Sequence, residues 1–165
     1  MYLLKELKRI MDEKHVKKMM IFVDMDGVIA DYRFGEGDNI KSNKAGTYFN
    51  KRPISTTIDN LEIISKETNI ELGIVSSCLF EEQAKEKDLW LDKYVPFIPK
   101  EKRIYTMADN FESRKQLKVD KIKNYMENNK NTLVVLIDDT HEILFLAKKQ
   151  LGELFMPMHV ITLID

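Results

Sequence analysis

The stretch IFVDMDGVIAD at residues 21–31 decides the fold of this chain. Its first residues are uniformly apolar, as in a strand that is buried on both faces of a parallel sheet, and the apolar run ends at Asp24. A second carboxylate, Asp26, follows two positions later, and Gly27 comes directly after it. Carboxylates at the end of a buried strand are costly unless they are hydrated, paired or bound to a metal ion. The stretch therefore predicts a buried strand that delivers two carboxylates to a polar site.

The rest of the chain alternates short apolar runs with segments of helical spacing. The apolar runs predict strands at 19–24, 70–75, 103–106, 132–137 and 158–164. The helical spacing predicts helices at 2–14, 55–69, 81–91, 113–128 and 140–150. In the third of these helices, Leu89 and Trp90 are the expected core contacts. This alternation favours an α/β protein with a mainly parallel, Rossmann-like sheet that is flanked by helices.

Length and composition favour one domain over residues 1–165, because 44% of the side chains are apolar, which is enough for a sizeable core. Within it, residues 1–18 predict an amphipathic helix on the outside of the domain. Residues 31–54 break the pattern with glycines, asparagines and scattered aromatic residues, which predicts a loop or a minimal cap.

Charge and cysteine content exclude several classes of function. The formal net charge of −1 gives no electrostatic case for binding a nucleic-acid duplex or an acidic membrane surface. No apolar run approaches the length of a membrane span, and residues 1–20 lack a signal-peptide core. The single cysteine, Cys78, excludes a disulfide framework and fits a reducing compartment. We therefore expect a cytoplasmic protein, either a monomer or a homodimer.

Polar side chains stand at the ends of three predicted strands, and ligands bind outside the carboxyl ends of strands in an open parallel sheet. These strand-end residues are Asp24 with Asp26, Ser76 with Ser77, and Asp138 with Asp139. The stretch ESRKQLK at 112–118 adds basic groups at the start of a predicted helix, namely Arg114, Lys115 and Lys118. Together, in this order, these groups predict a site for a phosphate group.

The acidic residues suit the hydrolysis of a phosphomonoester. Asp24 would attack phosphorus and form an aspartyl-phosphate, which divides a very slow reaction into two steps. Asp26 would give a proton to the leaving oxygen and later take one from the attacking water. A cation must lie between the phosphate and the carboxylates, because like charges repel. Mg²⁺ would supply it, held by Asp24, the main-chain carbonyl of Asp26, Asp138 and Asp139.

The non-bridging phosphate oxygens need hydrogen-bond donors and a basic group. The Ser76 hydroxyl, with Ser77 beside it, and the amides of the Asp26–Gly27 turn would bind these oxygens. Gly27 would let the chain turn closely around the phosphate.

The basic group is expected among the three candidates at 114–118. Lys115 is preferred, because Ser113 precedes it near the expected helix start and Leu117 follows inward. Lys118, as a further substrate-binding group, and Arg114 remain open.

The segment DMDGVIAD at 24–31 resembles motif I, DxDG[VT], of the haloacid dehalogenase superfamily of phosphohydrolases. Ser76 matches the strand-end Ser/Thr of that superfamily, a basic residue at 114–118 its motif III lysine, and IDD at 137–139 its motif IV. Within the superfamily, DMDGVIADY is most similar to the 5′(3′)-deoxyribonucleotidase and 5′-nucleotidase branch. The resemblance implies Asp24 as nucleophile, Asp26 as acid and base, and Asp138 and Asp139 as ligands of Mg²⁺.

The short segment at 31–54 bears on the substrate. Nucleotidases of this kind recognise the base with a larger cap that carries aromatic residues, whereas the candidates here are Tyr32, Phe34, Tyr48 and Phe49. We expect a small phosphorylated substrate, with nucleotides among the candidates. A phosphoprotein or polynucleotide end as substrate, and a non-catalytic phosphate-binding protein, are the alternatives.

Calcium-binding loops and receiver domains also carry clustered carboxylates, but they fit this pattern less well. An EF-hand loop would need an oxygen ligand at Val28, and a receiver domain carries its acidic pair first in the chain rather than last. Ser76 as a plain strand end, and the two C-terminal aspartates as a helix N-terminal charge pair, remain open. His15, His141 and His159 lack the spacing of metal ligands. No basic residue adjoins Cys78 in the sequence to lower the pKa of its thiol.

Overall fold

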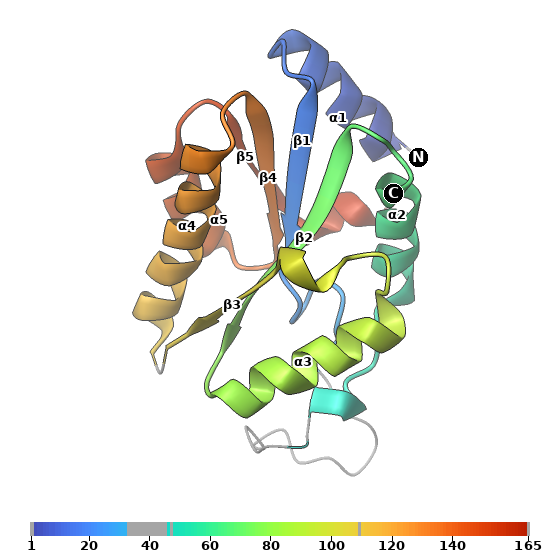
Figure 1. The fold of residues 1–165 in the computed structure, drawn as a ribbon, viewed down its shortest axis with the longest axis vertical. Helices are drawn as coiled ribbons and strands as arrows, with labels where there is room; N and C mark the ends of the chain where they lie inside the picture. Colours follow the sequence, from blue (N-terminus) through green and yellow to red (C-terminus); the bar gives the residue numbers. More distant parts are fainter. Residues whose placement is uncertain (1, 33–45, 47, 109, 165) are drawn as a thin grey trace.

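The sheet at the centre of the molecule confirms the α/β prediction. The computed structural model describes residues 2–32, 46, 48–108 and 110–164. Five strands form one sheet in the order β3-β2-β1-β4-β5, and every neighbouring pair is parallel (Figure 1). The fold is thus a Rossmann-like α/β arrangement in which the mainly parallel sheet of the prediction is parallel throughout.

The helices and strands follow the predicted order along the chain. The strands are β1 (Lys18–Val23), β2 (Ile70–Cys78), β3 (Arg103–Met107), β4 (Thr132–Asp138) and β5 (Phe155–His159). The α-helices are α1 (Tyr2–Glu13), α2 (Ser55–Ser65), α3 (Glu81–Tyr94), α4 (Phe111–Asn128) and α5 (His141–Leu151). Short 3-10 helices are η1 (Tyr48–Asn50), η2 (Lys100–Lys102) and η3 (Val160–Leu163). Most of the predicted cap, residues 33–45 and 47 with Phe34 among them, lies outside the described residues.

Alternate residues of each central strand feed two separate hydrophobic cores, because successive side chains of a strand point to opposite faces. In β1, Met19, Ile21 and Val23 join a core with residues of α1, α2 and α3. Met20 and Phe22 join the other core, with residues of α4 and α5. Figure 1 shows these two groups of helices on opposite sides of the sheet. Both faces of β1 are therefore buried, as its uniform apolar run indicates.

Two local predictions are wrong. Leu89 is 54% exposed, because it lies two residues from both Lys87 and Leu91 and so faces away from the buried side of α3. The sequence predicts the last strand at 158–164, but the strand begins at Phe155 and its continuation is η3. β5 is an edge strand, where Pro157 is tolerated because only one side of the strand needs ladder hydrogen bonds.

The strand order places a ligand crevice between β1 and β4. The chain leaves β1 for β2 and β3 on one side and later builds β4 and β5 on the other, so the direction of winding changes there. Ligands of open α/β sheets bind outside the carboxyl ends of the strands at such a switch point. Val23 pairs with Ile137, and the Asp24 N–H donates to the Ile137 carbonyl at 2.9 Å. Asp24 and Asp138 thus come out side by side at this point.

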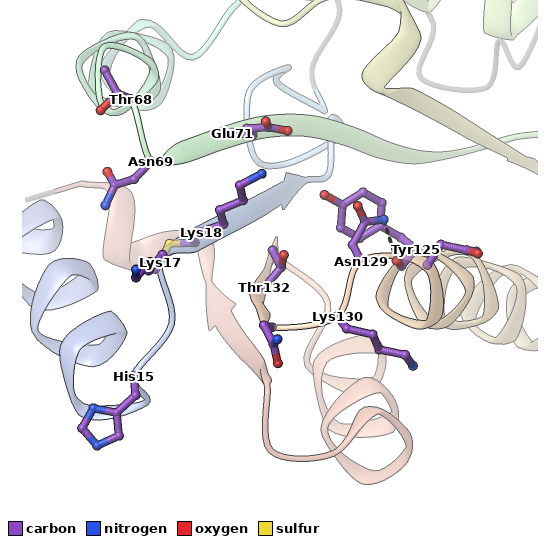
Figure 2. A pocket seen from close by; sticks show the side chains of 13 residues that line it. His15, Lys17, Lys18, Thr68, Asn69, Glu71, Tyr125, Asn129, Lys130 and Thr132 are labelled. Atoms are coloured by element: carbon purple, nitrogen blue, oxygen red, sulfur yellow. Dashed lines mark hydrogen bonds between the residues drawn. The ribbon is translucent and has the colours of Figure 1, made fainter.

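A cavity of about 630 Å³ lies at the opposite, amino-terminal edge of the sheet (Figure 2). Its lining includes Lys17, Lys18 and Lys130 and none of the predicted site residues. Lys17 and Lys130 lie in the segments that connect α1 to β1 and α4 to β4. None of the described helices is both long and apolar enough to cross a membrane.

Candidate active site

Three carboxylates converge at the switch point between β1 and β4. Asp24 follows β1 directly, Asp138 is the last residue of β4, and Asp139 comes next in the chain. One carboxylate oxygen of each lies within 4.8 Å of the others. Asp24 and Asp138 are buried, at 7% and 0% exposure, and Asp139 is half-buried. The acidic residues that the sequence places at two separate strand ends therefore form one cluster.

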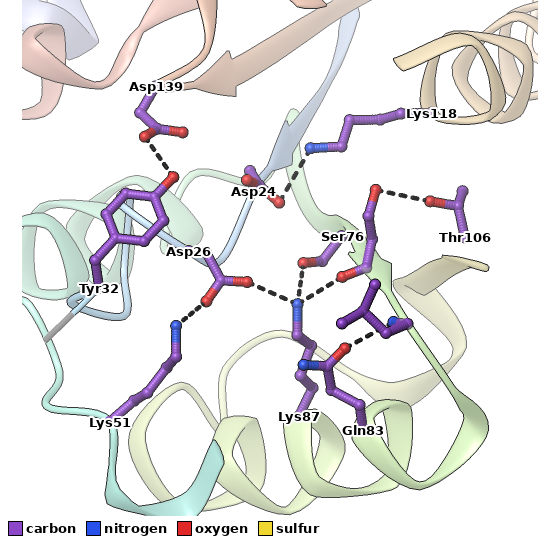
Figure 3. A network of polar contacts seen from close by, with 12 residues as sticks. Asp24, Asp26, Tyr32, Lys51, Ser76, Gln83, Lys87, Thr106, Lys118 and Asp139 are labelled. Carbon is purple, nitrogen blue, oxygen red and sulfur yellow. Dashed lines mark hydrogen bonds and ion pairs between the residues drawn. The ribbon is translucent and has the colours of Figure 1, made fainter. Parts of the chain in front are cut away.

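A buried ammonium group partly neutralises this cluster. Lys118, on α4, lies 2.8 Å from Asp138 Oδ2. It also lies 3.1 Å from Asp24 Oδ1, a contact that Figure 3 shows. Burial alone would lower the pKa of Lys118, but the charges of Asp24 and Asp138 raise it above its usual value. Burial raises the pKa of Asp24, and Asp138 and Asp26 raise it further, against the lowering effect of Lys118. Lys118 thus stays charged beside an aspartate whose ionised form is disfavoured.

Lys118, and not the preferred Lys115, is the basic residue that α4 delivers to the site. Lys115 pairs with Glu112 at 2.7 Å and lies over the Phe111 ring. The helix begins at Phe111, two residues earlier than predicted. Its phase then puts Lys118 on the buried face with Val119 and Ile122, so the preference for Lys115 is corrected by the packing of α4.

Lys87, on α3, is a site residue that the sequence reasoning missed. Its side chain is fully buried, and its Nζ donates to Asp26 Oδ2 and Ser76 Oγ at 2.8 Å and to the Ser77 carbonyl at 2.9 Å. A signal is present, because Lys87, Trp90 and Leu91 have the i, i+3, i+4 spacing of one helix face. Within the charged run EEQAKEK, however, this lysine is indistinguishable from a solvated residue.

Lys51 approaches Asp26 from the other side, so that two ammonium groups hold this carboxylate. The Lys51 Nζ donates to Asp26 Oδ1 and lies 5.0 Å from the centre of the Tyr48 ring. Burial alone would raise the pKa of Asp26, but Lys87 and Lys51 outweigh it and hold that pKa well below its usual value. Asp26 is therefore a carboxylate in this structure. Figure 3 shows Lys118, Lys87 and Lys51 entering the site from three directions.

The two serines of β2 face different surroundings. The buried Ser76 hydroxyl accepts from Lys87 and faces the site, as predicted. The Ser77 hydroxyl lies 3.0 Å from Thr106 Oγ1 on β3, and only the Ser77 carbonyl contacts Lys87. Neighbouring side chains of a strand point to opposite faces, so the Ser77 hydroxyl points away from the face that carries the Ser76 hydroxyl. The structure therefore does not support the prediction that the Ser77 hydroxyl binds substrate.

Gly27 shapes the turn after β1. It has φ +77°, a conformation that glycine adopts without strain, and its N–H donates to the Ala30 carbonyl at 2.8 Å. A Cβ at this position would collide with Asp139 Oδ2 and lie 2.6 Å from the Tyr32 ring. The Tyr32 hydroxyl donates to Asp139 Oδ2 at 2.8 Å, which holds the third carboxylate of the cluster in place.

The donor set fits a hard divalent cation. The carboxylates of Asp24, Asp138 and Asp139 offer only oxygen atoms, the ligands that Mg²⁺ prefers. Lys118 contacts one oxygen each of Asp24 and Asp138, and the remaining Asp138 oxygen accepts from the Thr140 N–H at 2.9 Å. The Asp26 side chain faces lysines instead, so only its main-chain carbonyl is left for the predicted metal role.

The structure gives the surroundings of two histidines and of the cysteine. The ring of His141 stacks on that of His159, with their centres 4.6 Å apart. Cys78 is buried, and burial raises the pKa of its thiol to about 11 despite the nearby Lys87, which agrees with an unreactive cysteine. Comparisons with protein-family models and with curated proteins gave no match for this chain.

Proposed function

We propose that this protein is a Mg²⁺-dependent phosphomonoester hydrolase that forms an aspartyl-phosphate on Asp24, with nucleotides among its candidate substrates. One observation carries the proposal. Asp24 stands at the switch point between two further carboxylates and two buried ammonium groups, Lys118 and Lys87. The resemblance of DMDGVIAD to motif I of the haloacid dehalogenase superfamily supports the same chemistry.

In the first step, a carboxylate oxygen of Asp24 attacks phosphorus while the bond to the leaving oxygen breaks and its electron pair stays on that oxygen. Lys87 Nζ and the Ser76 hydroxyl, already 2.8 Å apart, would bind non-bridging oxygens of the phosphate. Bound Mg²⁺ would offset the repulsion between the phosphate and the acidic cluster. The products of this step are a phosphorylated Asp24 and the free alcohol.

Asp26 would handle the proton of both steps. In the structure it is ionised because Lys87 and Lys51 hold it. A phosphate that takes hydrogen bonds from Lys87 weakens this hold, which favours a proton on Asp26 for the leaving oxygen. In the second step, water attacks phosphorus, its proton goes to Asp26, and inorganic phosphate leaves with Asp24 restored.

The proposal is tested by phosphate release from a panel of phosphomonoesters with Mg²⁺ and with a chelator. The panel contains ribo- and deoxyribonucleotides, sugar phosphates, an aryl phosphate, a phosphopeptide and a 5′-phosphorylated oligonucleotide. We expect turnover that requires Mg²⁺, since four carboxylates otherwise face the phosphate and the described residues place three ammonium groups around them. Equal turnover in chelator would contradict the metal role, and no release from any substrate would contradict the proposed function.

Replacing the buried lysine of α3 is expected to weaken turnover strongly. Lys87→Met removes a donor to the phosphate and should lower kcat/KM by about 10²-fold or more. Lys85→Met is the matched control, because Lys85 is exposed on the same helix and should change kcat/KM less than about twofold. Steady-state kinetics on the best substrate of the panel measures both. Similar kinetics for the two variants would remove Lys87 from the mechanism.

A further inference from the structure

Arg114 is a half-buried basic residue with no partner in the described part of the chain. Its buried Nε–H has no hydrogen-bond acceptor, and its guanidinium makes no ion pair there. Its neighbour Lys115 is paired with Glu112, and the three lysines of the site each contact a carboxylate. A buried donor without a partner is rare and costs free energy, so it needs an explanation.

The helix phase places Arg114 beside the candidate active site. Arg114 lies four residues before Lys118 on α4, so the two side chains share a face of the helix. Lys118 reaches Asp24 at 3.1 Å. Arg114 is about 6 Å nearer the amino end of α4, and helical side chains also lean that way. Arg114 therefore lies on the same face of α4 as Lys118 and one turn closer to the amino end of the helix, which follows the carboxyl end of β3 at the edge of the sheet that carries the site.

The same part of α4 favours negative charge. Arg114 is in the first turn, where its N–H donates to the Asn110 carbonyl at 3.1 Å. The amino end of an 18-residue helix carries a partial positive charge that adds to that of the guanidinium. A guanidinium can bind the two oxygens of a phosphate or carboxylate in parallel. A substrate group with such oxygens would pair with the charge and the terminal N–H groups of the guanidinium, whereas the buried Nε–H is not accessible to a ligand.

We propose that Arg114 determines substrate specificity by binding a second anionic group of the substrate, a phosphate or carboxylate about one helical turn from the phosphate that is hydrolysed. The inference rests on the proposed phosphohydrolase activity and narrows its substrate class to doubly anionic phosphomonoesters. Lys87 and Ser76 bind the reacting phosphate, and Arg114 holds the other end of the molecule.

The test compares substrates that differ only in the second anion: adenosine 3′,5′-bisphosphate with adenosine 5′-monophosphate, and 3-phosphoglycerate with glycerol 3-phosphate. Wild type should prefer the doubly anionic member of at least one pair. Arg114→Met should lower kcat/KM for that member by about tenfold or more and change the singly anionic member less than about twofold. Arg114→Lys should recover part of the preference. Lys121→Met, an exposed change on the same helix, should leave both values unchanged.

Three results would overturn the inference. The first is that wild type shows no preference for a second anion. The second is that Arg114→Met lowers kcat/KM equally for both members of a pair, and the third is that Arg114→Met has no effect on kcat/KM. An equal loss would mean either that Arg114 contacts the reacting phosphate or that it supports the fold. Thermal melting of both Arg114 variants distinguishes these two explanations.

A binding measurement keeps the inference distinct from the proposed activity. Calorimetric titration of adenosine 3′,5′-bisphosphate into Asp24→Asn protein should give binding that weakens about tenfold when Arg114→Met is added. Binding of this kind without turnover in wild type would support the anion site while contradicting the hydrolase. Turnover of singly anionic esters, with bisphosphate binding that Arg114→Met leaves unchanged, would support the hydrolase and contradict the anion site.

Discussion

Asp24→Asn is expected to lower phosphate release by at least about 10³-fold, because the amide oxygen cannot replace the carboxylate as nucleophile. The substitution keeps the size and shape of the side chain at the end of β1. Asp59→Asn, the same chemical change at an exposed position of α2, should leave turnover within about twofold of wild type. Single-turnover assays with the best substrate measure the loss. Retained turnover in Asp24→Asn would exclude Asp24 as the nucleophile.

The same variant should lose no stability. Burial raises the pKa of Asp24 in the folded protein, so its ionised form opposes folding. A raised folded-state pKa gives a contribution to stability that is present at low pH and is lost as pH rises above the unfolded value of about 3.9. Asparagine carries no charge and avoids this loss at pH 7. Urea denaturation in chelator should therefore show Asp24→Asn at least as stable as wild type, and a clearly less stable variant would contradict this account.

Lys118→Met is expected to lower the free energy of unfolding by about 3–5 kcal/mol, because it leaves Asp24 and Asp138 buried together without their shared ammonium group. Lys115→Met is the matched control three residues away. It removes an i,i+3 ion pair with Glu112, whose side chain is 79% exposed, and such helix pairs contribute about 0.2–0.5 kcal/mol.

Urea denaturation of both variants in chelator measures the difference without help from a bound cation. A larger loss for Lys115→Met than for Lys118→Met would contradict the placement of Lys118 between the two carboxylates. Circular dichroism of the native proteins should show the same helix and strand content in both variants, because neither change breaks a backbone hydrogen bond.

Local sequence patterns determined the sheet and its acidic end. The apolar runs around Ile21 and Val135 are too uniform for a strand with one exposed face, so burial of both faces followed from the local sequence pattern alone. Parallel strands end at the same edge of a sheet, so the sequence predicts Asp24 and Asp138 at one edge, and the pairing of β1 with β4 makes them neighbours there. The polar strand ends and the turn at Gly27 could be predicted from the order of residues in the chain alone.

The tertiary structure alone decided which basic groups serve the site. A lysine side chain is long and flexible, and its target depends on how its helix is rotated against the sheet, which core packing fixes. Packing of α4 selected Lys118 over Lys115, and packing of Trp90 brought Lys87 inward from a charged run. Lys51 reaches Asp26 across 25 residues of chain, a distance over which no sequence period carries information. The carboxylates were set by the strands that carry them, but their counterions were set by how the helices pack.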